Sequence, residues 1–286
     1  MGPAAAACGA PPPKLKTTKI CWRPLPKATA LAAHVVGRRI EDVWCSNLRL
    51  REPLSKRRLR TLKGRQILSC ERRAKYLLLH LEGARTLLVH LGMSGNLLVT
   101  DERQKHDHVI FHLDDGAPLV YHDPRRFGIV LALTATQLKN CVWLQGLGVE
   151  PLSADFDVDL LAAACKGRQR PIKTLLLDGH VVVGVGNIYA SEALFAAAIR
   201  PTTAARRISR PRLERLVDAI RTTLQQAIDH GGTTIRDYAG SGTGGYFQRQ
   251  LAVYGREAEP CRTCGAKIKS IVQSGRSTFY CPQCQR

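Results

Sequence analysis

The stretch Val181-Val-Val-Gly-Val-Gly-Asn-Ile-Tyr-Ala-Ser-Glu-Ala-Leu-Phe195 places two glycines and an asparagine directly before an alanine-rich helical sequence. Gly184 and Gly186 allow the backbone to turn sharply and to approach a ligand closely. Asn187 begins a helix whose first N–H groups lack an intrahelical acceptor and lie at the positive end of the helix dipole. Both features favour a bound phosphate, although a tight turn without a ligand is the simpler alternative.

The net charge of the chain favours the phosphate interpretation. The 43 Lys and Arg residues outnumber the 23 Asp and Glu residues, which gives a net charge of +20. Such an excess is typical of proteins that bind a polyanion, so nucleic acid is the leading partner. A membrane surface is the weaker alternative, because no apolar run approaches the length of a spanning helix. We therefore expect no membrane partner.

The amino-terminal segment differs from the rest of the chain. Residues 1–13 show no hydrophobic periodicity, and we expect residues 1–34 as a whole to be irregular. Neither a charged start nor a continuous apolar segment is found, so a signal peptide is not indicated and the cytoplasm is the expected location. Scattered cysteines fit a reduced compartment: Cys8, Cys21, Cys45, Cys70, Cys141 and Cys165.

Residues 35–150 show the pattern of short strands. Glycine or Asp-Gly turns separate several of them, so an antiparallel β-sandwich is the economical interpretation. The expected strands are 40–44, 76–81, 86–90, 109–113, 119–121 and 129–133. Lys75 stands directly before one of these strands, where its position would be fixed. The basic runs 56–58 and 72–75 are otherwise typical of backbone-phosphate contacts or of a solvated face.

Three connections between these strands carry unusual residues. His90-Leu-Gly-Met-Ser-Gly95 places Met93 in a glycine-flanked turn, and Lys105-His-Asp-His108 clusters titratable groups. Asp123-Pro-Arg-Arg-Phe-Gly128 places two arginines beside a phenylalanine. Met93 could fill a gap in the core, the histidines could lie in a solvated loop, and the arginines could pair with surface carboxylates. Together, however, the loops suit a protein that extrudes a nucleotide from duplex DNA and fills the space that it leaves.

Helical periodicity begins after Gly148-Val-Glu-Pro-Leu152. We expect helices over 159–165 and 187–199, and a third from Ser209, a suitable N-cap with Pro211 in the first turn. The pair around Gly186 and Asn187 then forms a helix, a two-turn connection and a helix that presents backbone amides to a phosphate. Gly240-Ser-Gly-Thr-Gly-Gly-Tyr-Phe247 is too glycine-rich for regular structure and is typical of a lid or a connector.

Two Cys-x-x-Cys pairs follow, with a hairpin-like sequence between them. Four thiolates can close a tetrahedral zinc site without an open position, so we expect one structural Zn²⁺ ion; a redox role is the weaker alternative. The expected ligands are Cys261, Cys264, Cys281 and Cys284. Arg276, at the tip of the hairpin, would reach outward to DNA.

These motifs resemble the formamidopyrimidine-DNA glycosylases of the bacterial family that includes endonuclease VIII. The resemblance covers residues 35–286 and rests on the segments quoted above, with 73–78, 245–247 and 253–256. The Asp-Pro-Arg-Arg-Phe-Gly and Tyr-Phe segments resemble the branch that acts on oxidised purines. The family resemblance implies an α+β fold: an antiparallel β-sandwich over 35–150, a helix-two-turn-helix domain over 151–240, and a lesion loop with a zinc ribbon over 241–286.

The resemblance also implies an activity and residue roles. The enzyme would be a bifunctional glycosylase and abasic-site lyase that removes oxidised purines, such as 8-oxoguanine and formamidopyrimidines, from damaged double-stranded DNA. It would act as a monomer in a bacterial cytoplasm, associated with the nucleoid through DNA. The implied roles are catalysis by Lys75 and Arg276, DNA binding by His106, Arg125, Arg168, Lys173 and Asn187, and filling of the vacated space by Met93, Arg125 and Phe127.

The amino terminus departs from the family pattern. Members of the family begin, after removal of Met, with a proline whose amine attacks the sugar and a glutamate that handles protons. The nearest match, Pro11-Pro-Pro-Lys-Leu-Lys-Thr-Thr18, supplies no proline followed by an acid. An alternative hypothesis is therefore a protein that binds lesion DNA but is catalytically impaired. A transcription-type zinc-ribbon module is less favoured, because it leaves the sandwich loops unexplained.

Overall fold

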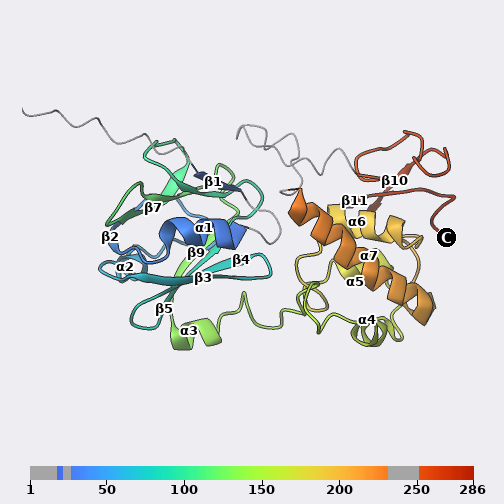
Figure 1. Ribbon diagram of the computed structural model, residues 1–286, viewed down its shortest axis with the longest axis horizontal. Helices are drawn as coiled ribbons and strands as arrows, with labels where there is room; N and C mark the ends of the chain where they lie inside the picture. Colours follow the sequence, from blue (N-terminus) through green and yellow to red (C-terminus); the bar gives the residue numbers. More distant parts are fainter. Residues whose placement is uncertain (1–17, 22–26, 231–250) are drawn as a thin grey trace, which may run out of the picture.

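The strands and helices form two bodies that lie side by side (Figure 1). The computed structural model describes residues 18–21, 27–230 and 251–286. The first body is made of antiparallel strands, and the second is made of helices with a short hairpin. No helix within these described ranges is long and apolar enough to cross a lipid bilayer.

One sheet of the first body has five strands in the order β1-β6-β8-β7-β2. All neighbours are antiparallel, as the pairing of Asn96 with His122 in β6 and β8 illustrates. The strands are β1 (Thr18–Cys21), β2 (Ile40–Cys45), β6 (Asn96–Val99), β7 (Asp107–Leu113) and β8 (Leu119–His122). Register shifts in β2 and β7 mark local bulges.

The second sheet has the order β3-β4-β5-β9 and is also antiparallel. Its strands are β3 (Ile67–Arg73), β4 (Tyr76–Leu81), β5 (Arg85–His90) and β9 (Ile129–Thr134). Leu79, Leu87, Phe111 and Tyr121 are fully buried in one apolar cluster that draws on both sheets. The expected β-sandwich and its six expected strands are confirmed.

The sequence pattern missed three strands and four helices, and three of these helices span only five residues each. Residues 18–21 and 27–34, which were expected to be irregular, form β1 and nearly all of helix α1 (Lys27–Val35). Strand β1 pairs with β6, and Leu31 and Val35, one helical turn apart, are fully buried in the sandwich core. Strands β3 and β6 were not expected either. β3 forms an edge of its sheet and carries several polar residues, so it shows little of the apolar alternation that identifies a strand.

Two further short helices belong to the first body, and the second of them follows its last strand, β9. They are α2 (Lys56–Arg60) and α3 (Ala135–Lys139). Helix α3 begins with a reciprocal capping box, in which Thr134 and Gln137 exchange side-chain and backbone hydrogen bonds. The chain then crosses to the second body (Figure 1).

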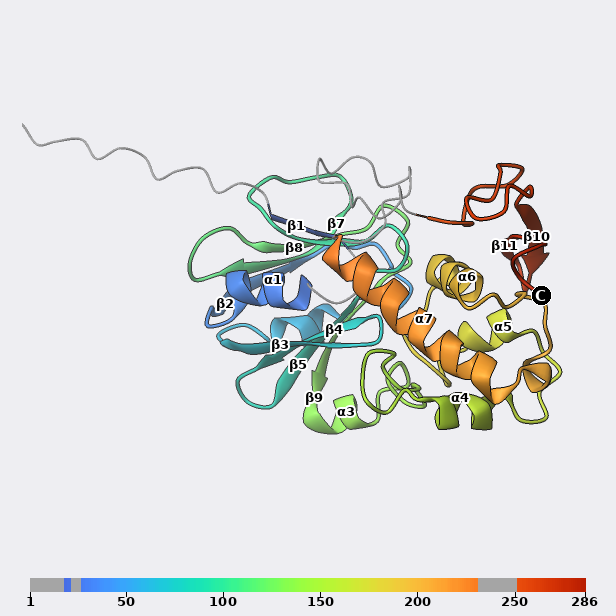
Figure 2. The same cartoon turned by 45° about the vertical axis from the view of Figure 1, so that its right-hand side comes forward.

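The second body has its own apolar core, formed mainly by four helices. They are α4 (Val158–Cys165), α5 (Ile172–Leu176), α6 (Asn187–Ala196) and α7 (Arg210–Asp229), with a short 3₁₀ helix η1 (Ala205–Arg207). Helix α7 buries the stripe that includes Leu213, Leu216 and Ile220, and Ser209 is its N-cap residue. Figure 2 shows α7 running across this body, with the hairpin beyond α6. The helices expected from 159, 187 and 209 are confirmed with small changes of boundary.

The carboxyl-terminal hairpin consists of β10 (Lys269–Gln273) and β11 (Arg276–Tyr280). Ser274 and Gly275 join the strands with φ angles of 49° and 72°, which gives a tight hairpin turn. Strand β11 packs against α6, so the hairpin is fixed to the start of that helix.

Candidate functional site

Two loops of the sandwich expose large apolar side chains. Met93 is 55% exposed and Phe127 is 47% exposed, so Met93 does not fill a gap in the core. The guanidinium of Arg125 lies 4.9 Å from the centre of the Phe127 ring, and its own backbone N–H donates to Ser94 Oγ at 3.2 Å. Neither Arg125 nor Arg126 pairs with a described carboxylate. The structure thus brings Met93, Arg125 and Phe127 to one place.

The histidine cluster lies beside these loops. The carbonyl oxygen of His106 accepts a hydrogen bond from the Asp123 N–H at 3.0 Å, and its ring meets that of His122 edge-on at 6.0 Å. His106 is half-buried, whereas His108 is buried. Burial lowers the pKa of His108, which is therefore neutral near pH 7.

Lys75 occupies the turn of the β3–β4 hairpin, directly before β4. Burial and the positive charge of Arg276 lower the pKa of its amine, so the neutral form is reached at a lower pH than in a solvated lysine. Burial, followed by the charges of Lys75 and Arg51, also lowers the pKa of His90 to about 4. The charge of Arg276, in the hairpin of the second body, therefore acts on the Lys75 amine. The same amine lies near His90, the last residue of the strand that leads to Met93.

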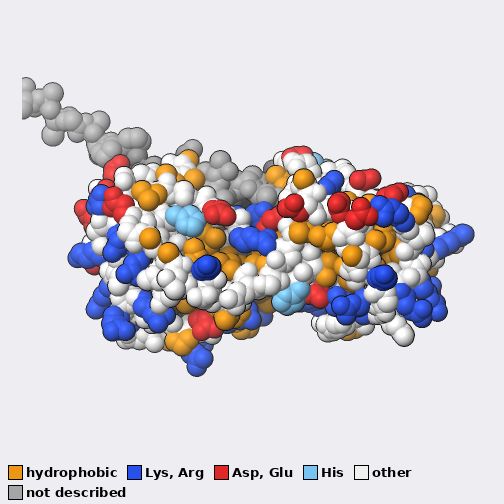
Figure 3. Space-filling view, turned by 90° about the horizontal axis from the view of Figure 1, so that it is seen from below, with side chains coloured by type: hydrophobic (Ala, Val, Ile, Leu, Met, Phe, Trp, Pro, Cys, Tyr) orange, Lys and Arg blue, Asp and Glu red, His pale blue; other side chains and the backbone are white. Residues whose placement is uncertain are grey.

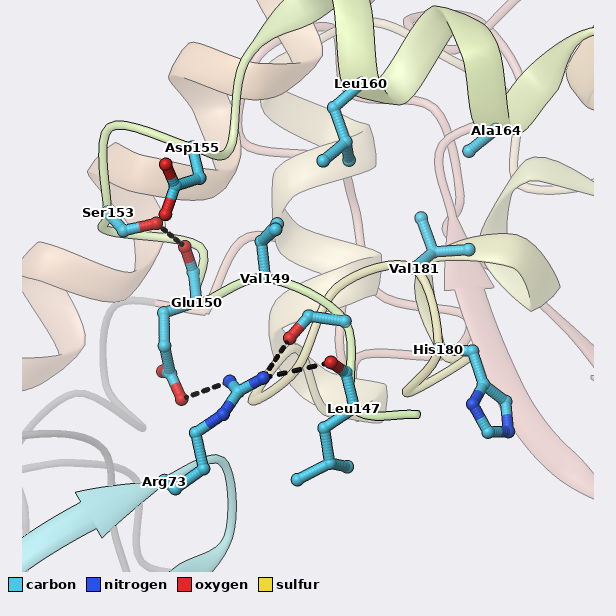
Figure 4. A pocket seen from close by; sticks show the side chains of 11 residues that line it. Arg73, Leu147, Val149, Glu150, Ser153, Asp155, Leu160, Ala164, His180 and Val181 are labelled. Carbon is cyan, nitrogen blue, oxygen red and sulfur yellow. Dashed lines mark hydrogen bonds and ion pairs between the residues drawn. The ribbon is translucent and has the colours of Figure 1, made fainter. Parts of the chain in front are cut away.

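A single carboxylate anchors this turn. Glu150 accepts hydrogen bonds from Arg72 Nη2 at 2.7 Å, from Arg73 Nη1 at 3.0 Å and from the Ala74 N–H at 2.7 Å. Figure 4 shows Arg73 reaching Glu150 and the carbonyl of Leu147 at the edge of a cavity of about 450 Å³. From the sequence, Glu150 was assigned only to a domain boundary. No local pattern predicts its contacts with Arg72 and Arg73, which lie more than 70 positions earlier in the chain.

The start of α6 meets the carboxyl-terminal hairpin. Asn187 donates from Nδ2 to the Ser277 carbonyl at 2.9 Å and to the Tyr254 hydroxyl at 3.3 Å. Gly186 is the N-cap residue and supplies no side-chain cap, so the first N–H groups of α6 are available to an anion. The contact with Ser277 places its neighbour, the exposed Arg276, beside this helix end.

Lys173 lies behind Asn187. Its amine donates to Asn187 Oδ1 and Thr278 Oγ1, each at 2.6 Å, and to the Ser277 carbonyl at 3.1 Å. Only 1% of the residue is exposed, and burial and the charge of Arg276 lower its pKa to about 8. The direct contact with DNA that the resemblance implies does not fit this burial, because all three N–H bonds of the ammonium group already have protein acceptors.

Arg168 lies apart from this cluster. It is exposed in the loop after α4, and its carbonyl accepts from the Arg206 N–H at 3.0 Å. None of the ion pairs among the described residues involves Arg168. Its role in DNA binding stays a prediction. Figure 3 shows one face of the molecule, on which Lys and Arg side chains lie over both bodies. The glycine-rich loop 240–247 and residues 1–17 lie outside the described residues.

The four expected zinc ligands converge in the second body. Their sulfur atoms all lie within 4.8 Å of one another, with 3.9 Å between Cys261 and Cys284 and 3.4 Å between Cys264 and Cys281. Thiolates around a tetrahedral zinc ion, at about 2.3 Å each, are separated by about 3.8 Å. The donor set and its spacing therefore fit one structural Zn²⁺ ion, which links the two ends of the ribbon.

The fold and the site define a two-domain protein, in which a β-sandwich with exposed loops faces a helical unit that carries a four-cysteine zinc ribbon. Three family models match the chain. The formamidopyrimidine-DNA glycosylase N-terminal domain matches residues 27–130, the H2TH domain of the same glycosylase matches 147–239, and the zinc finger found in FPG and IleRS matches 258–286. The chain belongs to the formamidopyrimidine-DNA glycosylase family.

Individual relatives agree with this family. The chain is 49% identical over 270 residues to the formamidopyrimidine-DNA glycosylase of Cupriavidus pinatubonensis, a match that covers 89% of this chain and 95% of the relative. It is 50% identical over 261 residues to that of Burkholderia thailandensis, covering 88% and 94%. Among solved structures, MutM (FPG) of Thermus thermophilus superposes with a TM-score of 0.80 at 38% identity, covering 90% and 95%. A Lactococcus lactis FPG mutant in complex with Fapy-dG DNA superposes with a TM-score of 0.83 at 33% identity, covering 91% and 97%.

Proposed function

We propose that the chain removes oxidised purines from double-stranded DNA, as a bifunctional glycosylase and abasic-site lyase. The observation that carries the proposal is the position of Lys75. This half-buried amine lies near the strand that leads to the exposed Met93 loop, and the positive charge of Arg276 in the zinc ribbon lowers its pKa further. A nucleotide held between the two bodies would meet both groups.

DNA binding would use both bodies. The net charge of +20 attracts the duplex, and the uncapped start of α6 with Arg276 suits a backbone phosphate. Lys173 would support this contact by fixing Asn187 rather than by touching DNA. The exposed Met93, Arg125 and Phe127 would occupy the space that the extruded nucleotide leaves.

The chemistry would proceed through a covalent intermediate. An amine attacks C1′ of the damaged nucleotide, the C1′–N bond to the base breaks, and the base leaves with a proton. The C1′–O4′ bond of the sugar then breaks, O4′ takes a proton, and the amine nitrogen and C1′ form a Schiff base. The Schiff base makes the C2′ proton acidic, and removal of this proton breaks the bond between C3′ and its oxygen and expels the 3′ phosphate. Lys75, with its lowered pKa, suits the transfer of these protons, and Arg276 suits the phosphate that leaves. In the family the attacking amine belongs to the amino terminus, and residues 1–17 lie outside the described residues.

The protein would act as a monomer in a bacterial cytoplasm, where DNA would associate it with the nucleoid. The names of its relatives and the lesion DNA in the Lactococcus lactis complex support the choice of substrate. A catalytically impaired lesion-binding protein is the alternative. Borohydride trapping distinguishes the two, because only a chain that forms the Schiff base becomes covalently attached to an 8-oxoguanine duplex.

The Arg125→Ala variant tests the space-filling role. Its affinity for a lesion duplex should fall about tenfold or more, whereas its affinity for undamaged duplex should fall only slightly, because a single phosphate contact is a small part of non-specific binding. Equal losses of affinity for both duplexes would show that Arg125 only contacts the phosphate backbone of DNA. Arg57→Ala, an exposed arginine on α2, is the control for charge alone.

A further inference from the structure

Asp123 is a fully buried carboxylate between the two exposed loops of the sandwich. It follows β8 directly, and none of its side chain reaches solvent. Ser94 Oγ donates to its Oδ1 at 2.7 Å, while the Tyr121 hydroxyl and the Gly128 N–H donate to its Oδ2 at 3.2 and 2.9 Å. No described lysine or arginine forms an ion pair with it, so hydrogen bonds alone offset its burial.

These donors come from both loops. Ser94 belongs to the turn that exposes Met93, and Gly128 closes the turn that exposes Phe127. Ser94 Oγ serves both turns, because it also accepts from the Arg125 N–H at 3.2 Å. One carboxylate and one hydroxyl therefore join the two turns through hydrogen bonds.

The packing beneath the loops leaves little room for another arrangement. A Cβ on Gly92, where φ is +65°, would lie 2.7 Å from the backbone carbon of Phe127. A Cβ on Gly128 would lie 1.6 Å from the hydroxyl oxygen of Tyr121. The Gly92 N–H also donates to Nδ1 of His90 at 3.1 Å, a contact that requires this nitrogen to be unprotonated.

We propose that Asp123 is the positioning residue that holds the Met93 turn and the Arg125–Phe127 turn in one fixed arrangement before DNA arrives. The inference rests on the proposed function and deepens it. The two apolar side chains are about half exposed, so packing of their own side chains cannot fix them, and their position depends on the backbone beneath. Fixing that backbone in advance removes the loss of conformational freedom that would otherwise oppose insertion into DNA. Asp123 itself, being buried and negative, does not touch the duplex.

Asp123→Asn tests the proposal with almost no change of volume. The amide NH₂ of asparagine must replace one of the two carboxylate oxygens. In place of Oδ2 it would face the Gly128 N–H, which can only donate, and in place of Oδ1 it would force the Ser94 hydroxyl to turn from donor to acceptor. We expect the affinity for a duplex with a tetrahydrofuran abasic-site analogue to fall about ten- to a hundredfold, the scale for a misplaced group at a site. The affinity for undamaged duplex should change less than about twofold, because phosphate contacts remain. Equal losses on both duplexes would overturn the proposal.

A double-mutant cycle gives a readout that a purely structural role would not move. If Asp123 acts through the loops, Asp123→Asn should weaken lesion binding much less when Phe127→Ala is already present. Additive losses would overturn the proposal. The stability control is Ile40→Val, a buried change in β2 away from both turns, which should lower the melting temperature and leave the ratio of the two affinities unchanged.

Hydrogen exchange of the DNA-free protein separates this inference from the proposed function. The Gly128 and Arg125 amides should exchange faster in Asp123→Asn than in the unaltered chain, whether or not the protein prefers lesion DNA. An unaltered chain that binds both duplexes equally would refute the proposed function, and unchanged exchange would refute the role of Asp123. If Asp123→Asn does not fold, Ser94→Ala keeps the carboxylate with its other two donors, and the same losses should appear at smaller size.

Discussion

Replacing Glu150 by alanine would release the turn that carries Lys75. The Glu150 carboxylate receives two guanidinium groups and one backbone N–H, all within 3.0 Å. Its side chain is 22% exposed, and those of Arg72 and Arg73 are 20% and 31% exposed. The pairing is therefore partly screened by solvent, but much less than a surface ion pair.

The expected loss of stability follows from these contacts. Removing one partner of a buried pair costs about 3–5 kcal/mol, and an exposed pair contributes about 0–1 kcal/mol. Arg73 keeps the carbonyls of Leu147 and Gly148, and Arg72 keeps that of Ala74, so neither guanidinium is left without an acceptor. We therefore expect Glu150→Ala to lower the free energy of unfolding by about 2–3 kcal/mol, between these limits.

The loss should depend on pH. Burial alone would raise the pKa of Glu150, but hydrogen bonds from Arg72 and Ala74 outweigh it and hold the pKa below its ordinary value. Because the folded pKa is the lower one, the stabilisation is fully present above the unfolded value of about 4.3 and disappears as the pH falls through the folded pKa. The difference between the two proteins should thus be constant near neutral pH and shrink in acid.

Urea unfolding followed by circular dichroism measures both effects, at pH 7 and at several values below about 4.3. Glu82→Ala is the matched control, since Glu82 also accepts from an arginine, Arg39 at 2.8 Å, and from a backbone N–H, that of Gln66 at 3.0 Å, but at an exposed site. Its loss should be the smaller of the two. A Glu150→Ala protein as stable as the unaltered chain, or a loss that persists in acid, would refute the reasoning.

Further predictions concern the metal, the amine, the helix start and the amino terminus. Cys264→Ser should release zinc, measured by elemental analysis, and unfold the ribbon, measured by proteolysis; retained zinc would contradict the ligand set. Lyase activity should rise with pH and level off below about pH 10.4, the pKa of a solvated lysine, because the pKa of Lys75 is lowered in the folded protein. The Lys75→Arg variant should lose this pH dependence, and identical pH profiles for the two proteins would exclude a role of Lys75 in proton transfer. Asn187→Ala should weaken duplex binding, because it removes the hydrogen bond that holds the Ser277 carbonyl at the start of α6, and an unchanged affinity for duplex DNA would exclude this role. A Pro-Glu-Leu-Pro-Glu-Val-Glu-Thr-Thr start joined to Leu31 should increase excision of 8-oxoguanine and borohydride trapping, and equal rates would show that another residue is the nucleophile.

Local patterns in the sequence identify much of this protein. Alternation of apolar residues predicts six of the strands that the sandwich contains, and Pro211 with its apolar stripe predicts α7. The zinc ligands are predictable because each Cys-x-x-Cys pair brings its two thiolates together within a single turn. Such features depend on residues a few positions apart, so the sequence displays them directly.

Other features become visible only in the tertiary structure. The family resemblance implies that Lys173 contacts DNA, yet its amine donates hydrogen bonds to Ser277 and Thr278, more than 100 positions later in the chain. Glu150 looks like part of a linker, and Asp123 like the start of a turn. The sequence determined which residues could carry charge, metal or an exposed apolar tip. The tertiary structure decided which of them are buried and paired, because a buried carboxylate or ammonium group is stable only where the whole fold supplies its partners.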